Sequence, residues 1–298
     1  MKHWKPAVIA ALWSGALYAA PMPVVASFSI LGDVAQQIGG ERVAVQSLVG
    51  ANQDAHAYNL TSSDIKKIRE ARLVLLNGLG LEKAELQRAV KQSKVASAEA
   101  TAGIKPLAAD EHHHEHDHGN DHDHGEFDPH VWNDPVLMQR YAANVAIALI
   151  KADPAGSRYY QQRFKDYQNV LNQLNNYANQ QFGAVAPAKR KVLTGHDSFA
   201  YLGKRYQVKF ISPQGVSSEA EPSARQIAAI IRQIKAENVK AVFTENIKDG
   251  RMIARIAKET GVKVSGGLYA DALSSGAPAG TYADMFRYNV RVMSEAMK

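Results

Sequence analysis

VVASFSI at Val24–Ile30 is the first of three short apolar runs, and VAVQSLV at Val43–Val49 and LVLL at Leu73–Leu76 follow it. Segments with helical spacing of apolar residues lie between them, at Val34–Ile38 and Thr61–Arg72. Short apolar runs with β-branched residues indicate buried strands. Strands that alternate with helices are typical of a parallel sheet with crossover helices, so this part of the chain is predicted to be α/β.

The second half of the chain repeats the alternation. Its strand-like segments are Val192–Thr194, Val208–Ser212, Val239–Thr244 and Val262–Leu268. Its helical segments are Phe199–Tyr206, Ser223–Glu237, Arg251–Thr260 and Thr281–Met297. The two halves show no close sequence repeat, but the same order of elements predicts a second α/β lobe.

A long helical segment joins the halves. Between Ala155 and Phe182, apolar and aromatic residues recur every three or four positions. Roughly 29 residues of helix span about 43 Å, which is longer than one small lobe. We therefore predict an N-terminal α/β lobe over residues 21–152, a rigid connecting helix over 153–183 and a C-terminal α/β lobe over 184–298. Two such lobes leave a cleft between them, where ligands commonly bind.

The N-terminus has the pattern of a secretory signal peptide. Lysines in Met1–Lys5 precede an apolar run from Pro6 to Ala20, which is too short and too rich in small residues to span a bilayer. We predict a signal peptide over residues 1–20 and a periplasmic protein. No cysteine follows the apolar run, so we expect no lipid anchor.

Composition excludes several classes of protein. Hydrophobic residues make up 46% of the 298 residues and charged residues 21%, values that are ordinary for globular proteins. The net charge of +6 comes from scattered basic residues, so we expect no nucleic-acid partner. Cysteine is absent, which excludes disulfides, thiolate zinc sites and cysteine nucleophiles. The sequence has no phosphate-binding glycine loop and no Gly-x-Ser-x-Gly elbow.

Residues 111–125, EHHHEHDHGNDHDHG, form a low-complexity segment without an apolar side chain. Such a segment has nothing to bury and is predicted to be a disordered loop. Seven of the eleven histidines of the chain lie in it: His112, His113, His114, His116, His118, His122 and His124. Imidazoles and carboxylates in a flexible chain can bind metal ions weakly, so we predict an accessory metal-binding role.

Three isolated histidines lie in loops that follow apolar elements. They are His56 in DAHAY, His130 in DPHVW and His196 in TGHDS. Because ligands collect beyond the carboxyl ends of parallel strands, we expect the three side chains to converge on one metal ion. Asp271, which follows the last predicted strand, is our choice for a fourth ligand; the weaker alternatives are Glu219, Glu221 and Glu245.

These motifs resemble those of the cluster A-I solute-binding proteins, which serve zinc and manganese ABC importers. Asp54-x-His56-x-Tyr58 with Asp64 downstream is similar to the first motif of that family. Asp128-Pro129-His130-x-Trp132, Gly195-His196-Asp197-Ser198 and Tyr269-x-Asp271 match the other three in order. The resemblance covers essentially the whole chain after the signal segment. It implies two α/β lobes bridged by a rigid helix, with the metal ion between them.

The resemblance also implies the ligands His56, His130, His196 and Asp271. Members that bind manganese usually have Glu where this chain has His196. Since imidazole suits zinc and carboxylate oxygen suits manganese, we predict Zn(II) as the bound ion. Ala55, where the family usually has proline, changes the stiffness of the loop and removes no ligand.

The implied activity is capture of zinc for a membrane permease of an ABC importer, without enzymatic activity. We expect a monomer, with a periplasmic zinc chaperone as a further candidate partner. A manganese or iron(II) protein of the same family is the first alternative. A zinc hydrolase is another, although the sequence has no His-Glu-x-x-His motif. A periplasmic zinc chaperone without an importer is the third.

Overall fold

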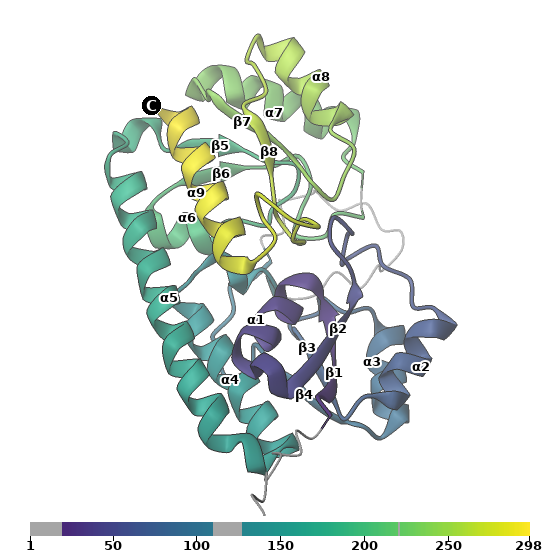
Figure 1. The fold of residues 1–298 in the computed structure, drawn as a ribbon. Helices are drawn as coiled ribbons and strands as arrows, with labels where there is room; N and C mark the ends of the chain where they lie inside the picture. The colour runs from purple at the N-terminus through teal and green to yellow at the C-terminus, as the bar shows by residue number, and fades with distance from the viewer. Residues whose placement is uncertain (1–19, 110–126, 220) are drawn as a thin grey trace, which may run out of the picture.

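The computed structural model describes residues 20–109, 127–219 and 221–298 (Figure 1). The predicted signal peptide therefore lies almost wholly outside the described residues, and the predicted His-rich loop lies outside them entirely. The described part has two lobes that share one long helix (Figure 1). None of its helices combines the length and the apolar character that crossing a membrane requires.

The N-terminal lobe contains a four-stranded parallel sheet in the order β2-β1-β3-β4. Its strands are β1 (Met22–Phe28), β2 (Val43–Val49), β3 (Leu73–Leu76) and β4 (Ala96–Glu99). Its helices are α1 (Ser29–Gly39), α2 (Ser62–Glu70), α3 (Ala84–Ser93) and α4 (Leu137–Ala152). The β3 side chains are all buried, as expected for a central parallel strand covered by helices on both faces.

The C-terminal lobe has a sheet of the same design, in the order β6-β5-β7-β8. Its strands are β5 (Lys191–Leu193), β6 (Lys209–Ile211), β7 (Ala241–Glu245) and β8 (Gly266–Leu268). Its helices are α6 (Ala200–Tyr206), α7 (Ala224–Glu237), α8 (Arg251–Thr260) and α9 (Tyr282–Met297). In each sheet the second strand in sequence lies on one side of the first, and the third lies on its other side. The point where the strand order reverses is therefore in the middle of each sheet.

Helix α5 (Ser157–Gly183) runs along one side of both lobes (Figure 1). Its 27 residues correspond to about 40 Å of helix. One stripe of the helix is buried, and this stripe consists of Tyr160, Tyr167, Leu171, Leu174, Ala178 and Phe182. The helix packs on α1 and α4 of one lobe and on α6 and α9 of the other. The predicted two-lobed α/β fold with a long connecting helix is confirmed.

The two lobes share a single hydrophobic core next to α5. One cluster of buried side chains includes Phe28 and Trp132 from the N-terminal lobe and Phe243 and Phe286 from the C-terminal lobe. Trp132 also donates a hydrogen bond from Nε1 to the carbonyl oxygen of Ala270, 2.8 Å away in the other lobe. Separating the lobes on this side exposes apolar surface, at a cost of about 25 cal/mol per Å².

The sequence patterns miss one strand and misplace another. Strand β4 is largely exposed and reads ASAE, so neither a hydrophobic run nor a clear alternation marks it. Strand β8 begins at Gly266 rather than at Val262 as predicted. The three residues that form it are Gly-Gly-Leu, and glycine carries little information about strand position.

Asp64 fixes the segment that leads from the His56 loop into α2. Its carboxylate accepts hydrogen bonds from the Tyr58 hydroxyl at 2.7 Å and from the Thr61 hydroxyl at 2.6 Å. Thr61 in turn caps α2, because its hydroxyl accepts from the Asp64 N–H. Burial opposes ionisation of Asp64, but hydrogen bonds from Thr61, Tyr58 and Lys67 outweigh it and lower the pKa of Asp64 from 3.8 to about 2.

The substitution Asp64→Asn is expected to lower the free energy of unfolding by about 1–2 kcal/mol at pH 7. The pKa of Asp64 is lowered by folding, so its stabilising contribution is present above about pH 4 and is lost as the pH falls towards 2. Urea denaturation of both proteins at pH 7 and pH 3 measures this. A difference between the proteins that stays constant over this range would contradict the assignment.

Candidate metal centre

Four buried side chains converge where the strands of the two sheets end. His56 lies in the loop after β2, and His130 lies between β4 and α4. His196 lies in the loop after β5, and Asp271 lies in the loop after β8. Only 7% of the surface of His56 is exposed, and the other three side chains are fully buried. The N-terminal and C-terminal lobes each contribute two of these groups.

One ligand atom from each residue lies within 4.8 Å of the others. Nε2 of His56 is 3.1 Å from Nε2 of His130 and 3.4 Å from Oδ2 of Asp271. Oδ1 of Asp271 is 3.5 Å from Nε2 of His130, and its Oδ2 is 3.1 Å from Nε2 of His196. The structure thus brings together the four residues that the sequence singled out.

Carboxylates hold two of the imidazole rings from behind. Nδ1 of His130 is 2.7 Å from Oδ1 of Asp128, and Nδ1 of His196 is 2.6 Å from Oε2 of Glu245. A proton on Nδ1 satisfies the carboxylate and leaves the Nε2 lone pair directed into the cluster. This is the arrangement that metal-binding histidines commonly have.

Glu245 thus orients His196, whereas the sequence suggested it only as a weaker alternative ligand. It is the last residue of β7, and its Oε1 accepts hydrogen bonds from the N–H groups of Gly195 and His196. The sequence offered one signal for this role, the position of Glu245 at the end of a strand. Because β7 pairs with β5, that end lies next to the loop that carries His196. The other two alternatives lie apart from the cluster: Glu219 pairs with Lys83, and Glu221 is exposed.

The charges of the cluster depend on one another. Burial by itself lowers the pKa of His196, but the carboxylates of Glu245 and Asp271 outweigh burial and raise that pKa well above its ordinary value. Burial by itself raises the pKa of Asp271, but His196 and His130 outweigh it and hold that pKa well below its ordinary value. A cation in the cluster is therefore strongly favoured, whether it is a proton on His196 or a metal ion.

The donor set fits a divalent metal ion. Both oxygens of Asp271 and Nε2 of His196 are buried and have no hydrogen-bond partner with acceptable geometry. Buried polar atoms without a partner are costly, at about 1–3 kcal/mol each. Three imidazole nitrogens and one carboxylate are suitable ligands for zinc and for neighbouring transition metals.

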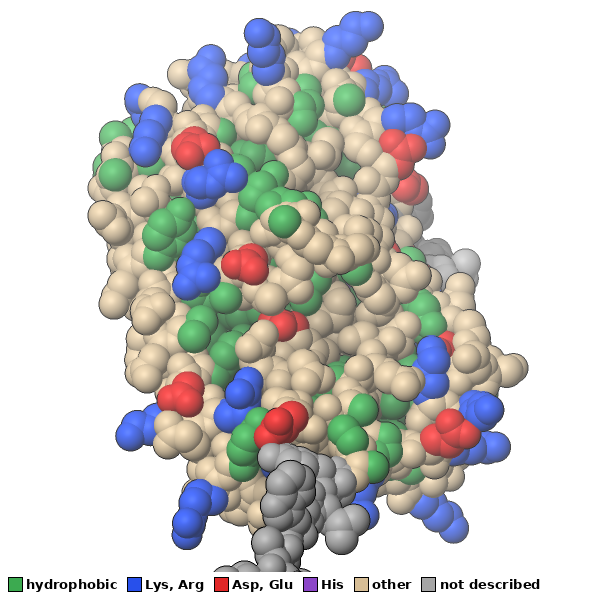
Figure 2. All heavy atoms as spheres, in the orientation of Figure 1, with side chains coloured by type: hydrophobic (Ala, Val, Ile, Leu, Met, Phe, Trp, Pro, Cys, Tyr) green, Lys and Arg blue, Asp and Glu red, His purple; other side chains and the backbone are tan. Residues whose placement is uncertain are grey.

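The seven histidines of the predicted accessory loop, 112–124, lie outside the described residues. On the face of the molecule drawn in Figure 2, no described histidine is visible among the coloured side chains. Lys and Arg are instead spread over the periphery of both lobes (Figure 2). This view agrees with the burial of His56, His130 and His196.

Residues 24–296 match the family described as the periplasmic zinc-uptake complex component A, ZnuA. The chain belongs to this family. The match covers nearly all of the sequence, including both lobes and all four residues of the cluster. The resemblance expected from the sequence motifs is confirmed.

Relatives in this family are named for different metals. The chain is 32% identical over 287 residues to the manganese-binding lipoprotein MntA of Bacillus subtilis, and the alignment covers 93% of this chain and 90% of that protein. It is 28% identical over 273 residues to the iron-binding protein YfeA of Yersinia pestis, with 91% and 85% covered. The structure of the periplasmic zinc-binding protein TroA from Treponema pallidum superposes with a TM-score of 0.85 at 26% identity, covering 93% of this chain and 99% of TroA.

Family membership settles the general activity. ZnuA-family proteins are metal-binding components of ABC transporters, so the chain is a substrate-binding protein and not an enzyme. The transporter supplies a membrane permease as partner, and the family acts outside the cytoplasm. Several relatives are lipoproteins, which differs from the unanchored protein expected from the sequence.

The substitution Glu245→Gln is expected to weaken metal binding tenfold to a hundredfold. The amide keeps the size of the side chain but presents N–H to Nδ1 of His196, which favours the tautomer with a proton on Nε2. Calorimetric titration of the metal-free protein with zinc measures the change.

Glu295→Gln provides a matched control, because Glu295 is exposed on α9, pairs with Arg291 and lies outside the four-residue cluster. Its affinity should equal that of the wild type. If Glu245→Gln also stays within about twofold of the wild type, Glu245 has no part in orienting His196.

Proposed function

We propose that this protein captures Zn(II) with high affinity in the periplasm and delivers it to the permease of an ABC importer for zinc uptake. The observation that supports zinc is the composition and spacing of the buried cluster, with three imidazoles and one carboxylate. Zinc prefers four ligands of this kind, and four protein ligands leave no open position for a reacting water. A closed site suits capture of an ion rather than hydrolysis.

The spacing of the ligand atoms supports the same ion. Zinc bonds of 2.0–2.1 Å in a tetrahedron separate neighbouring ligand atoms by about 3.3–3.4 Å. The distances from Asp271 to Nε2 of the three histidines are 3.4, 3.5 and 3.1 Å, and the His56–His130 distance is 3.1 Å. Two different oxygens of Asp271 make these contacts, and one ligand atom from each residue lies within 4.8 Å of the others, so the four groups can close around a single ion.

Manganese or iron(II) is the second candidate, and the carboxylate of Asp271 favours it. Both oxygens of Asp271 face histidine nitrogens, so the group is placed to bind through two oxygens. Five ligand atoms suit the larger, oxygen-preferring ions better than zinc. The names of MntA and YfeA add weight to this alternative.

Loading requires that His196 lose its proton. In the metal-free protein, Glu245 and Asp271 keep the pKa of His196 high, so the ion displaces a proton from a ring already held in position. Acid therefore weakens binding, because protons compete with the metal for Nε2. The permease completes the cycle when it separates the two halves of the site.

The proposal has further parts that rest on the sequence. The protein acts as a monomer. It carries no lipid anchor on cysteine, because the sequence contains no cysteine. Its signal peptide covers residues 1–20, and the lobes divide at residues 152 and 183. A periplasmic zinc chaperone is a candidate donor of the ion.

Titration of the metal-free protein with zinc, manganese and iron(II) tests the metal assignment. We expect zinc to bind at one tight site and to displace manganese at equal concentration. Asp271→Ala is expected to weaken zinc binding at least a hundredfold, because it removes the charged ligand and leaves three buried imidazoles. Preference for manganese in the competition would replace zinc by the alternative.

Deletion of residues 111–125 tests the accessory role proposed for the seven loop histidines. The truncated protein should keep the tight site, because none of its four ligands is removed, and should lose the additional weak zinc equivalents of the full chain. Equilibrium dialysis over a range of zinc concentrations counts these equivalents. Equal stoichiometry for both proteins would show that the loop binds no zinc.

A further inference from the structure

The two lobes meet differently on the side of the molecule away from α5. Helices α2 and α3 lie on this side of the N-terminal lobe (Figure 1). Polar side chains connect the lobes here. Asp54 contacts Ser218 at 2.5 Å, Lys83 contacts Glu219 at 2.8 Å, and Asn52 contacts Asn246 at 3.0 Å. We call Asp54, Ser218, Lys83 and Glu219 the interlobe latch.

His56 is the ligand nearest to this edge and the least enclosed of the four. It is the only member of the cluster with exposed surface, at 7%. Carboxylates hold the rings of His130 and His196 through Nδ1, whereas His56 is held through its backbone N–H, which donates to Asp54. The position of His56 therefore depends on the backbone of its loop.

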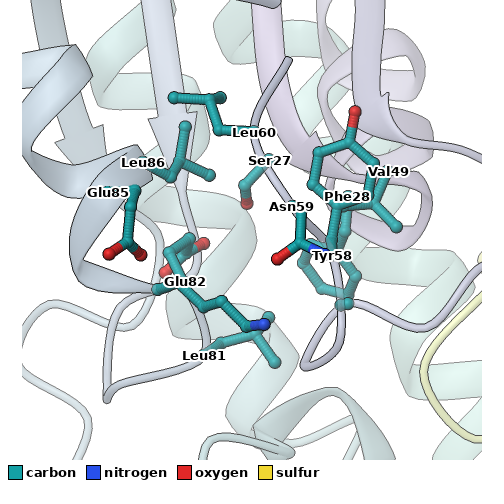
Figure 3. A pocket seen from close by; sticks show the side chains of 12 residues that line it. Ser27, Phe28, Val49, Tyr58, Asn59, Leu60, Leu81, Glu82, Glu85 and Leu86 are labelled. Atoms are coloured by element: carbon teal, nitrogen blue, oxygen red, sulfur yellow. The ribbon is translucent and has the colours of Figure 1, made fainter.

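A cavity of about 280 Å³ lies behind that loop (Figure 3). Tyr58 and Leu60 of the loop line it together with Leu81 and Leu86, which lead into and lie on α3, and Leu60 lies beside Leu86. The cavity is partly open to solvent, since the exposed side chain of Glu85 also lines it. The loop that carries His56 therefore has space on its inner side to move away from the cluster.

Asp54 joins this loop to the other lobe. Its Oδ1 accepts hydrogen bonds from the backbone N–H groups of His56 at 2.9 Å and Ala57 at 3.3 Å. Its Oδ2 accepts from the hydroxyl of Ser218, whose side chain is fully buried. One carboxylate thus connects the turn that presents His56 to the loop after β6 in the C-terminal lobe.

We propose that Asp54 and Ser218 are positioning residues for His56, and that the interlobe latch sets the rate at which the metal ion leaves the site. This inference rests on the proposed role of His56 as a metal ligand. While the latch is closed, Ser218 holds Asp54 and Asp54 holds the His56 turn against the ion. When the latch opens, the turn moves towards the cavity, and His56 is the first ligand to release.

The Lys83–Glu219 pair closes the same edge but is more exposed, with 29% and 47% of the two side chains accessible. Exposed ion pairs are weak and are screened by salt. We therefore expect loss of the Ser218 hydrogen bond to have the larger effect on metal release. Because salt screens the ion pair, we also expect release to become faster at high ionic strength.

Release rates of zinc test the proposal. The zinc-loaded protein is mixed with an excess of chelator, and the loss of bound zinc is followed by stopped flow. Ser218→Ala is expected to release zinc about tenfold faster than the wild type, because a hydrogen bond to a carboxylate is lost. Ser218→Thr keeps the hydroxyl and should restore most of the slow release.

Two readouts separate positioning from a general loss of structure. The midpoint of thermal unfolding of the metal-free protein should change little in Ser218→Ala, and the rate of zinc binding should change less than the rate of release. If the rate of zinc binding changed as much as the rate of release and the midpoint of thermal unfolding fell as well, the substitution would have damaged the fold. That result would overturn the proposal.

The ion pair has its own test by charge exchange. Lys83→Glu and Glu219→Lys singly should each release zinc about two- to fivefold faster, and the double variant should return towards the wild-type rate. Lys209→Glu is the matched control, because Lys209 and its partner Glu237 both lie in the C-terminal lobe. This control should leave the rate unchanged.

The outcomes distinguish the two proposals. If the wild-type protein binds no zinc tightly, the proposed function fails and manganese replaces zinc as the probe for release. If the wild type binds zinc but Ser218→Ala and the charge-exchange variants release it at the wild-type rate, the interlobe latch is wrong and the proposed function stands.

Discussion

The negative charge of Asp271 is the constraint on which the arrangement of the two lobes depends. The carboxylate is fully buried, and neither of its oxygens has a hydrogen-bond partner among the described residues. A buried charge without compensation is strongly destabilising, so positive charge must come from a proton or a metal ion held by the neighbouring imidazoles. His196 belongs to the same lobe as Asp271, and the other two imidazoles, His56 and His130, belong to the N-terminal lobe, so a metal ion held by all four groups joins the two lobes.

The shared core beside α5 makes this contact dependable. Trp132 anchors the carbonyl group of Ala270, which directly precedes Asp271, and the Tyr282 hydroxyl donates to the carbonyl oxygen of Trp132. A continuous apolar cluster surrounds these bonds. The lobes are therefore fixed along one side and joined by a few polar contacts on the other, which confines large movement to the edge near His56.

Sequence patterns located the fold and the centre of the site but left out what supports it. Val43–Val49 and Leu73–Leu76 were predicted with their observed bounds because buried parallel strands are continuous apolar runs. His56, His130 and His196 were singled out because three histidines lie in separate loops that follow apolar elements, within motifs that resemble those of the family. Glu245 was not assigned its role, since its contact with His196 joins residues 49 positions apart through adjacent strands. Ser218 carried no signal, because its partner Asp54 lies 164 residues away in the other lobe.

The repeated strand order of the two sheets has a mechanical consequence. The strands of both sheets end near the same point, and each lobe contributes two residues to the cluster. His56 and His130 come from the N-terminal lobe, and His196 and Asp271 come from the C-terminal lobe. An ion bound there joins the two lobes, and neither lobe alone supplies all four ligands. A transporter therefore does not have to contact the ion itself, since a small tilt of one lobe against the other separates the two pairs of ligands.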